Sequence, residues 1–297
     1  MPRPDDPLAT LSARPAVQQA VDAARQACSD LRWHPALRRR TAEVRTEACV
    51  RAAAASAELD GVRLPLAQVR AMVVPGGGTG APGDDRVGAA AAVVDPAADP
   101  GPADASGPAV PVDPVDAVVR GALRASLEAH GLARGLSRAP AQVLARLHTL
   151  AAADLVGRAA GPAGTATLGR PRPEAAARVE GLVRLLADGT DAPGLVLAAV
   201  ADAECVVTAA FTPGSGVLAR ALARTVLVGT GLDPLGVTVP ERAALADRAG
   251  RDEALAAYAS GGAAGVEAWV VWWGQTVVAG AEQGRRVADE VMAGRLA

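Results

Sequence analysis

The sequence predicts an almost entirely α-helical protein with one short segment of β character. Apolar residues recur at helical spacing over most of the 297-residue chain. Only residues 157–173 combine Gly, Thr and Pro in a short alternating pattern, which is typical of a hairpin or loop. Half of the residues are hydrophobic, but aromatic residues make up only 2%. The core is therefore expected to consist of Ala and Val on closely packed helices, with Trp33, Trp269, Trp272 and Trp273 as its few large side chains.

The N-terminal part divides into two predicted units. Residues 1–34 form a loose tail, residues 1–13, followed by a first helix, residues 15–31. Residues 35–74 form the second unit, with a long helix over 35–59 and a shorter helical segment over 64–74. Between these two segments, Asp60–Gly61 is a typical helix stop.

Residues 75–114 differ sharply in composition from the rest of the chain. This segment consists almost entirely of Gly, Pro, Ala, Asp and Val. Such a stretch buries too little apolar surface to offset the entropy lost on ordering. It is predicted to be a disordered linker, and its glycines lack the strand–turn–helix context of a dinucleotide or phosphate motif.

Residues 115–297 are predicted to form the main helical unit. Its helices are expected at 115–135, 139–155, 174–188, 194–210, 216–230, 240–259 and 263–292.

Composition excludes several classes of function. The net charge is −2 and no basic block stands out, so a nucleic-acid surface is disfavoured. The longest apolar run, residues 268–281, is interrupted by Gln275 and is too short to span a bilayer. The first fifteen residues lack the apolar region of a signal peptide. We therefore expect a cytoplasmic protein with no membrane association.

Cysteine and histidine residues show no metal-ligand spacing. The three cysteines lie in apolar helical patterns and are expected to be buried free thiols: Cys28, Cys49 and Cys205. His34, His130 and His148 are not grouped with them, so no metal site is expected. His148, on an apolar helix face, is predicted to be a packed, hydrogen-bonded core residue.

The most informative motif is the turn Gly214–Ser215–Gly216, directly before a predicted helix. Backbone N–H groups and the helix N-terminus at such a turn can hold a phosphate. A plain helix–helix turn is the structural alternative.

Residues 209–220 read A-A-F-T-P-G-S-G-V-L-A-R, which resembles the signature H-P-F-x-[D/E]-G-N-G-R-x-x-R of the Fic (Fido) family. Phe211, Gly214, Gly216 and Arg220 match the signature, and Ser215 replaces its Asn. The resemblance implies an all-α, Fic-like helical bundle with a short β-hairpin flap, in which the turn and Arg220 bind phosphate.

Three further features have counterparts in that family. Ser56, Asp60 and Gly61 match the inhibitory-helix motif [S/T]-x-x-x-E-[G/N], with Asp in place of Glu. "GTATLG", residues 164–169, lies where the family has its hairpin flap. "EAWVVWW", residues 267–273, resembles its C-terminal aromatic helix. The resemblance covers about residues 35–74 and 115–292.

The departures from the signature concern the catalytic groups. Ala209 stands where the family has the histidine that deprotonates the target hydroxyl. Pro213 replaces the acid that holds Mg²⁺, and Val217 replaces the first arginine. Loss of a positioned base alone usually lowers a rate by about 10²- to 10⁴-fold. Asp202, Glu204 and Thr208, on the preceding helix, are poor substitutes in position or chemistry.

These observations predict a catalytically degenerate Fic-like protein, a binding or interaction module with a vestigial nucleotide-phosphate pocket. The alternatives are an active nucleotidyltransferase of the AMPylation type with a non-standard site, and a structural helical protein whose pocket has closed. The only cofactor that the resemblance implies is ATP, and its binding is expected to be weak. A protein partner fits the first hypothesis. The sequence identifies neither that partner nor an oligomeric state.

The resemblance also predicts a specific contact. In the inhibited class of the family, the acid of the helix motif pairs with the second arginine of the signature. The corresponding residues here are Asp60 and Arg220, with Glu58 as a competing acid. The alternative is that Asp60 ends its helix in solvent while Arg220 pairs with Asp202 or Glu204.

Overall fold

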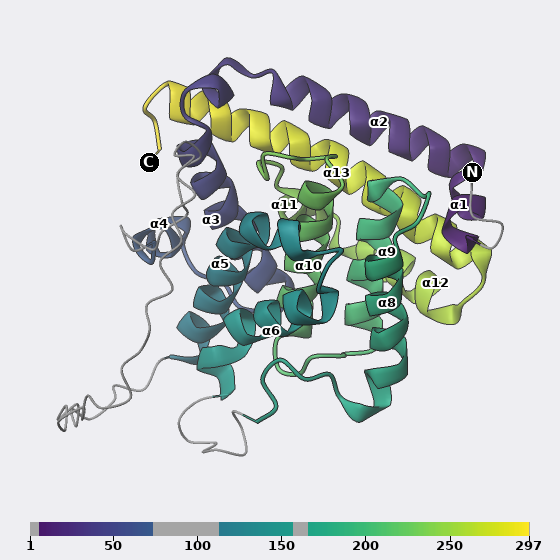
Figure 1. Ribbon diagram of the computed structural model, residues 1–297. Coiled ribbons are helices and arrows are strands. Elements are labelled where there is room, and N and C mark those ends of the chain that lie inside the picture. Colours follow the sequence, from purple (N-terminus) through teal and green to yellow (C-terminus); the bar gives the residue numbers. More distant parts are fainter. Residues whose placement is uncertain (1–5, 74–112, 157–165, 297) are drawn as a thin grey trace, which may run out of the picture.

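Helices supply all the regular secondary structure in the part of the chain that the computed structural model describes, namely residues 6–73, 113–156 and 166–296 (Figure 1). The predicted all-α class is confirmed. In these ranges one apolar core joins side chains from the N-terminal helices, such as Leu11 and Val50, to side chains of the C-terminal half, such as Leu222 and Val277. The segments predicted as N-terminal units therefore share their core with the rest.

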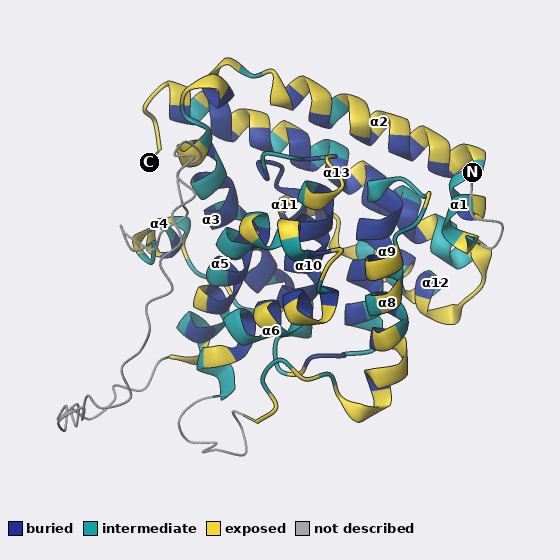
Figure 2. Ribbon diagram, in the orientation of Figure 1, coloured by how far each residue is buried: buried dark blue, intermediate teal, exposed yellow. Residues whose placement is uncertain are grey.

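Two buried helices form the centre of the molecule. α9 (Gly194–Val207) and α10 (Ser215–Gly229) pack against each other and are buried over most of their surface (Figure 2). A helix that is apolar on nearly every side must lie inside the protein. α3 (Thr41–Leu59), α5 (Pro114–Leu132) and α6 (Pro140–Val156) pack against α10. The turn between α9 and α10 is therefore held between central helices.

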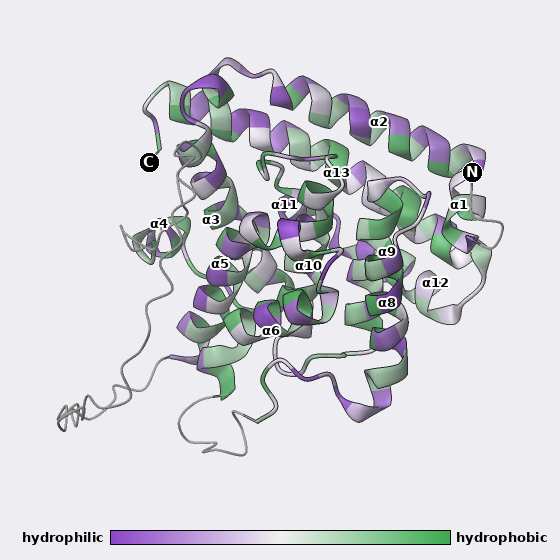
Figure 3. Ribbon diagram, in the orientation of Figure 1, coloured by the Kyte–Doolittle hydropathy of each residue, from purple (hydrophilic) through white to green (hydrophobic). Residues whose placement is uncertain are grey.

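α2 (Pro15–Arg32) and α13 (Ala263–Met292) form a long parallel pair along one edge (Figure 1). Glycines on α13 permit the close approach, because a Cβ at Gly274 would lie 2.8 Å from Cβ of Ala20. Polar contacts join both ends of this helix pair: the Arg14–Glu267 ion pair at one end, and His34 Nε2 at 3.0 Å from Asp289 Oδ1 at the other. Hydrophilic residues recur along α2 (Figure 3).

The remaining elements are short or peripheral: α1 (Pro7–Ser12), η1 (Pro35–Arg38), α4 (Leu66–Ala71), η2 (Ala133–Gly135), η4 (Pro173–Ala175), α8 (Ala176–Asp188), α11 (Pro240–Ala246) and α12 (Arg248–Ser260).

Three predictions about helix boundaries were wrong. Part of the predicted loose tail is α1, because the Asp6 carboxylate accepts hydrogen bonds from the Leu8 and Ala9 amides and caps the helix. The helix predicted over 35–59 is divided into η1 and α3. The helix predicted over 240–259 is divided at Asp247, whose side chain caps α12 through the Gly250 amide.

The predicted hairpin and linker fall largely outside the described residues. Of the hairpin segment, residues 166–173 are described and contain a turn over 166–169 but no strand. Of the predicted linker, only 113–114 are described; they begin α5, which Asp113 caps through the Val115 amide at 2.8 Å. The helix therefore begins before the predicted end of the linker.

The tryptophans and cysteines are buried as the sequence predicted, with one exception. Trp269, Trp272 and Trp273 are buried, whereas Trp33 at the end of α2 is 63% exposed. All three cysteines are buried free thiols, as predicted.

Candidate functional site

The predicted phosphate turn connects the two central helices. Gly214 adopts a left-handed conformation, with φ of 95°, and is the N-cap residue of α10. Ala209, at the other end of the turn, also has a positive φ of 44°, an uncommon conformation for a residue with a Cβ. Inside the turn, the Ser215 hydroxyl accepts a hydrogen bond from the Phe211 amide at 2.8 Å. The hydrogen bond to Ser215 and the left-handed conformation of Gly214 thus stabilise the turn.

Arg220 lies one turn and a half further along α10 and is only 6% exposed. Its Nε donates to the Ser56 hydroxyl at 2.7 Å, and its Nη2 donates to the Ser56 carbonyl at 2.9 Å. Nη2 also donates to Asp60 Oδ1 at 2.8 Å. The predicted Asp60–Arg220 pair is confirmed, and Ser56 from the same motif contributes two of the three hydrogen bonds.

The Asp60 carboxylate also lies against the start of α10. A Cβ built on Gly216 would be 2.5 Å from Asp60 Oδ1 and 2.9 Å from Oδ2. Only glycine leaves room for the carboxylate at this position. Anionic groups are stabilised at helix N-termini by the helix dipole and by the free N–H groups of the first turn. Asp60 therefore places a negative charge beside the turn predicted to hold a phosphate.

The competing partners are engaged elsewhere. The Glu58 carboxylate lies 3.5 Å from Arg63. Glu204 forms two hydrogen bonds with Arg178, at 2.6 and 2.8 Å, and accepts another from Tyr258. Asp60 does end α3, as the alternative supposed, and Gly61 follows it with φ of 87°. The helix stop and the ion pair thus coexist in the same two residues.

Arg248 also holds the end of α3, and the sequence analysis missed it. Its guanidinium donates to the Glu58 carbonyl at 2.6 Å and to the Leu59 carbonyl at 3.3 Å. Arginine near a helix C-terminus satisfies carbonyls that have no partner in the helix. Since Arg248 lies on α12, far from α3 in sequence, local spacing gives no signal for this contact.

Asp202 is buried and lines a small cavity together with Arg220. Its Oδ2 accepts a hydrogen bond from the Trp273 indole at 3.1 Å, while Oδ1 has no partner within the described residues. Burial raises the pKa of Asp202, and the positive charge of Arg251 opposes this shift only in part. A cavity of about 20 Å³ adjoins Asp202, Arg220 and Arg251, which is room for about one water molecule.

His148 on α6 contacts the turn between α9 and α10 and does not face solvent. It is completely buried; Nδ1 accepts a hydrogen bond from the Gly169 amide at 2.9 Å, and Nε2 lies 3.0 Å from the Pro213 carbonyl. These contacts define a neutral imidazole with the proton on Nε2. Burial lowers the pKa of His148, as expected for a group whose charged form loses its hydration. The predicted structural role is confirmed.

The catalytic positions of the signature contribute no reactive group. Ala209 is half-buried and Val217 is buried, and neither side chain can transfer a proton or bind a metal. Thr208 donates its hydroxyl hydrogen bond to the Glu204 carbonyl at 2.6 Å. Asp202 and Glu204 are engaged as described above. The arrangement can hold charge, but the described part of the chain presents no free base beside the turn.

Within the described residues, no group of His, Cys, Asp and Glu side chains is arranged to hold a metal ion. The helices there are also too short or too polar to cross a membrane. Neither a known protein-family model nor a curated protein sequence matches the chain.

Proposed function

We propose that this protein is a catalytically inactive, Fic-like binding module whose phosphate turn is occupied by its own Asp60 carboxylate. The observation that carries the proposal is the position of that carboxylate, which is hydrogen-bonded to Arg220 and lies against Gly216. An incoming phosphate would compete with Asp60 for the same arginine and the same helix end.

The residues at the turn support the absence of phosphoryl or nucleotidyl transfer. Such transfer needs a base for the attacking hydroxyl and cations for the phosphates. Ala209 supplies no base and Pro213 supplies no metal ligand. Arg220 is the one cation of the signature that remains, and its guanidinium is bound by Ser56 and Asp60. The remaining role is recognition, with a protein as the expected partner and ATP as at most a weak ligand.

An inhibited enzyme and an inactive module differ in what happens when the inhibitory contact is removed. The test uses ATP labelled in its α-phosphate, Mg²⁺ and the full chain, both wild type and Asp60→Ala. An inhibited enzyme would label itself or added proteins once Asp60 is gone. The proposal predicts no labelling by either form. Mg²⁺-dependent labelling by Asp60→Ala would overturn the proposal in favour of an active nucleotidyltransferase with a non-standard site.

A further inference from the structure

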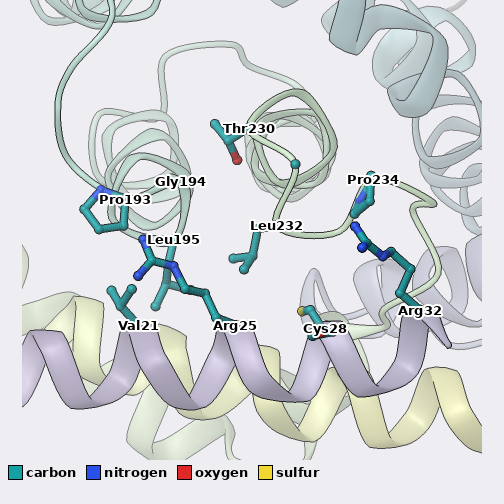
Figure 4. A pocket seen from close by; sticks show the side chains of 12 residues that line it. Val21, Arg25, Cys28, Arg32, Pro193, Gly194, Leu195, Thr230, Leu232 and Pro234 are labelled. Carbon is teal, nitrogen blue, oxygen red and sulfur yellow. The ribbon is translucent and has the colours of Figure 1, made fainter.

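A second cavity, of about 210 Å³, lies between α2, the N-terminus of α9 and the segment that follows α10 (Figure 4). Neither Asp60 nor Arg220 lines this cavity. Its walls combine the aliphatic side chains of Val21, Leu195 and Leu232 with the side chains of Arg25 and Arg32. The lining residues include these two arginines and no carboxylate.

The two arginines flank the buried face of α2, and both are exposed. Val21, Arg25, Cys28 and Arg32 follow the i, i+4, i+7, i+11 spacing of one helix face. Figure 4 shows their side chains leaving α2 on the same side, toward α9 and the segment after α10. The Arg25 guanidinium lies beside Pro193 and Leu195, and that of Arg32 beside Pro234.

Neither positive charge is strongly neutralised. Arg25 lies 3.6 Å from Asp22, in an ion pair whose two side chains are both more than half exposed. Such pairs are worth little, because water screens them. Arg32 forms no ion pair within the described residues, and its guanidinium lies 5.4 Å from the ring centre of Trp33. Asp233, between Leu232 and Pro234 in sequence, is buried and accepts hydrogen bonds from the Val237 and Thr238 amides.

Two helix ends with opposite dipoles meet at this cavity. Pro193 is the N-cap residue and offers no capping side chain, and the first turn of this 14-residue helix contains no acid. Thr230 and Gly231, just past the C-terminus of α10, line the same cavity, where the helix dipole is negative. A Cβ on Gly194 would lie 2.1 Å from Thr230 Oγ1, so the two ends are adjacent and their dipoles largely offset each other. The groups that favour a negative ligand in this cavity are therefore the two arginines.

We infer that this cavity binds a small organic anion with a negatively charged group at each end. Arg25 and Arg32 are seven residues apart, so their backbones are separated by about 10 Å along the helix. That spacing suits a short chain bearing two carboxylates, or one carboxylate and one phosphate. The volume suits a small metabolite, because it is below the roughly 300–1,000 Å³ of drug-sized ligand sites.

The test is a titration of the ¹⁵N-labelled full chain, followed by amide NMR and calorimetry. Glutarate and 3-phosphoglycerate serve as two-ended probes, with acetate and inorganic phosphate as single-ended comparisons. Arg25→Gln and Arg32→Gln, alone and together, remove the charges from exposed side chains. Arg184→Gln is the matched control, because Arg184 is also mostly exposed, at 69% against 58% for Arg25, and lies 4.0 Å from Glu180 on another helix.

We expect saturable binding of at least one two-ended probe, with shifts at the Gly194 and Leu195 amides. Affinity should fall about tenfold or more in the double variant and stay unchanged in Arg184→Gln. Single-ended probes should bind at least about tenfold more weakly. No saturable binding, or binding that the double variant retains, would overturn the inference; the arginines would then merely cover apolar surface with their aliphatic stems. Asp60→Ala should leave this binding unchanged, which separates the result from the fate of the proposed function.

Discussion

Arg220 donates a 2.8 Å hydrogen bond to Asp60, and the two residues are separated by 160 positions in the sequence. The arginine is 6% exposed and the aspartate side chain 30% exposed, so the pair lies at the edge of the core. The same carboxylate stands over Gly216 at the start of α10. One acid thus joins the end of α3 to the beginning of α10 and neutralises Arg220.

The pair should contribute measurably to stability. In a double-mutant cycle with Asp60→Ala and Arg220→Gln, we expect a coupling energy of about 1–3 kcal/mol, between the values for exposed and buried charge pairs. Arg220→Gln should be the more damaging single change, because it also loses the two hydrogen bonds to Ser56.

Urea unfolding of the four proteins measures this coupling. Glu58→Ala is the matched control, since Glu58 is similarly exposed but pairs with Arg63; its coupling to Arg220→Gln should be near zero. A coupling energy near zero for Asp60 would show that the contact adds nothing to folding.

The effect of Gly216→Ala on the free energy of unfolding should depend on the residue at position 60. In the wild-type background the new methyl group would lie 2.5 Å from Asp60 Oδ1, so the carboxylate must move away from Arg220. We expect a loss of about 1–3 kcal/mol, as for other overpacked sites. In the Asp60→Ala background only the end of the flexible Arg220 side chain, with Nη1 at 3.1 Å, lies close to the new methyl group, so alanine should cost much less and can gain from its higher helix propensity. Thermal unfolding compares the two backgrounds; equal effects in both would place the Asp60 side chain elsewhere.

His148 should make stability depend on pH below about 6.5. Burial places its folded-state pKa below the ordinary value of 6.5, so the unfolded chain binds a proton more readily than the folded protein. The stabilisation is therefore complete above about pH 6.5 and is lost as the pH falls from there toward the folded-state pKa. His130, whose pKa burial and Arg45 also lower, adds to the same trend.

Urea unfolding of wild type and His148→Gln between pH 8 and pH 5 isolates this effect. The difference in stability between the two proteins should shrink as the pH falls, by at most about 1.4 kcal/mol per pH unit. Taking the difference removes the contributions of His130 and Asp202. A difference that stays constant over this range would mean that His148 titrates normally in the folded protein.

Asp202 should make the stability of the protein change with pH in the opposite direction. Burial raises its folded-state pKa above 3.8, so its contribution to stability is lost as the pH rises through that folded-state value. Asp202→Asn keeps an oxygen for the Trp273 indole but cannot ionise. We expect it to stabilise the protein at pH 8 by about 1–2 kcal/mol, with a smaller gain in acid. Destabilisation at pH 8 would show that an ionised Asp202 is needed beside Arg220 and Arg251.

Local sequence patterns predicted most of the helices, because apolar spacing reports the face that each helix buries. The helix predicted over 263–292 coincides with α13. The capping of α1 and α12 was open to prediction, since Asp6 and Asp247 are typical N-cap residues. However, α1 has only six residues, and α12 lies in a helical pattern that runs on from α11.

Tertiary contacts were predictable only where a spaced motif linked two segments. Asp60 and Arg220 stand in two segments that resemble motifs of one family, and this resemblance predicted their contact. Arg248 at the end of α3, and the arrangement of Arg25 with the end of α9, depend on how separate helices pack. The exposure of Trp33 was missed for a similar reason. Trp33 directly follows the last residue of α2, and its burial depends on how the chain continues into η1.

The most direct test of the central claim is a calorimetric titration of ATP, without Mg²⁺, into wild type, Asp60→Ala and Glu58→Ala. If Asp60 occupies the anion site at the start of α10, wild type and Glu58→Ala should give no binding heat up to millimolar ATP. Asp60→Ala should bind at least about tenfold more tightly, and a further Arg220→Gln change should abolish the gain. Equal ATP affinity in wild type and Asp60→Ala, whether measurable or absent, would contradict the claim.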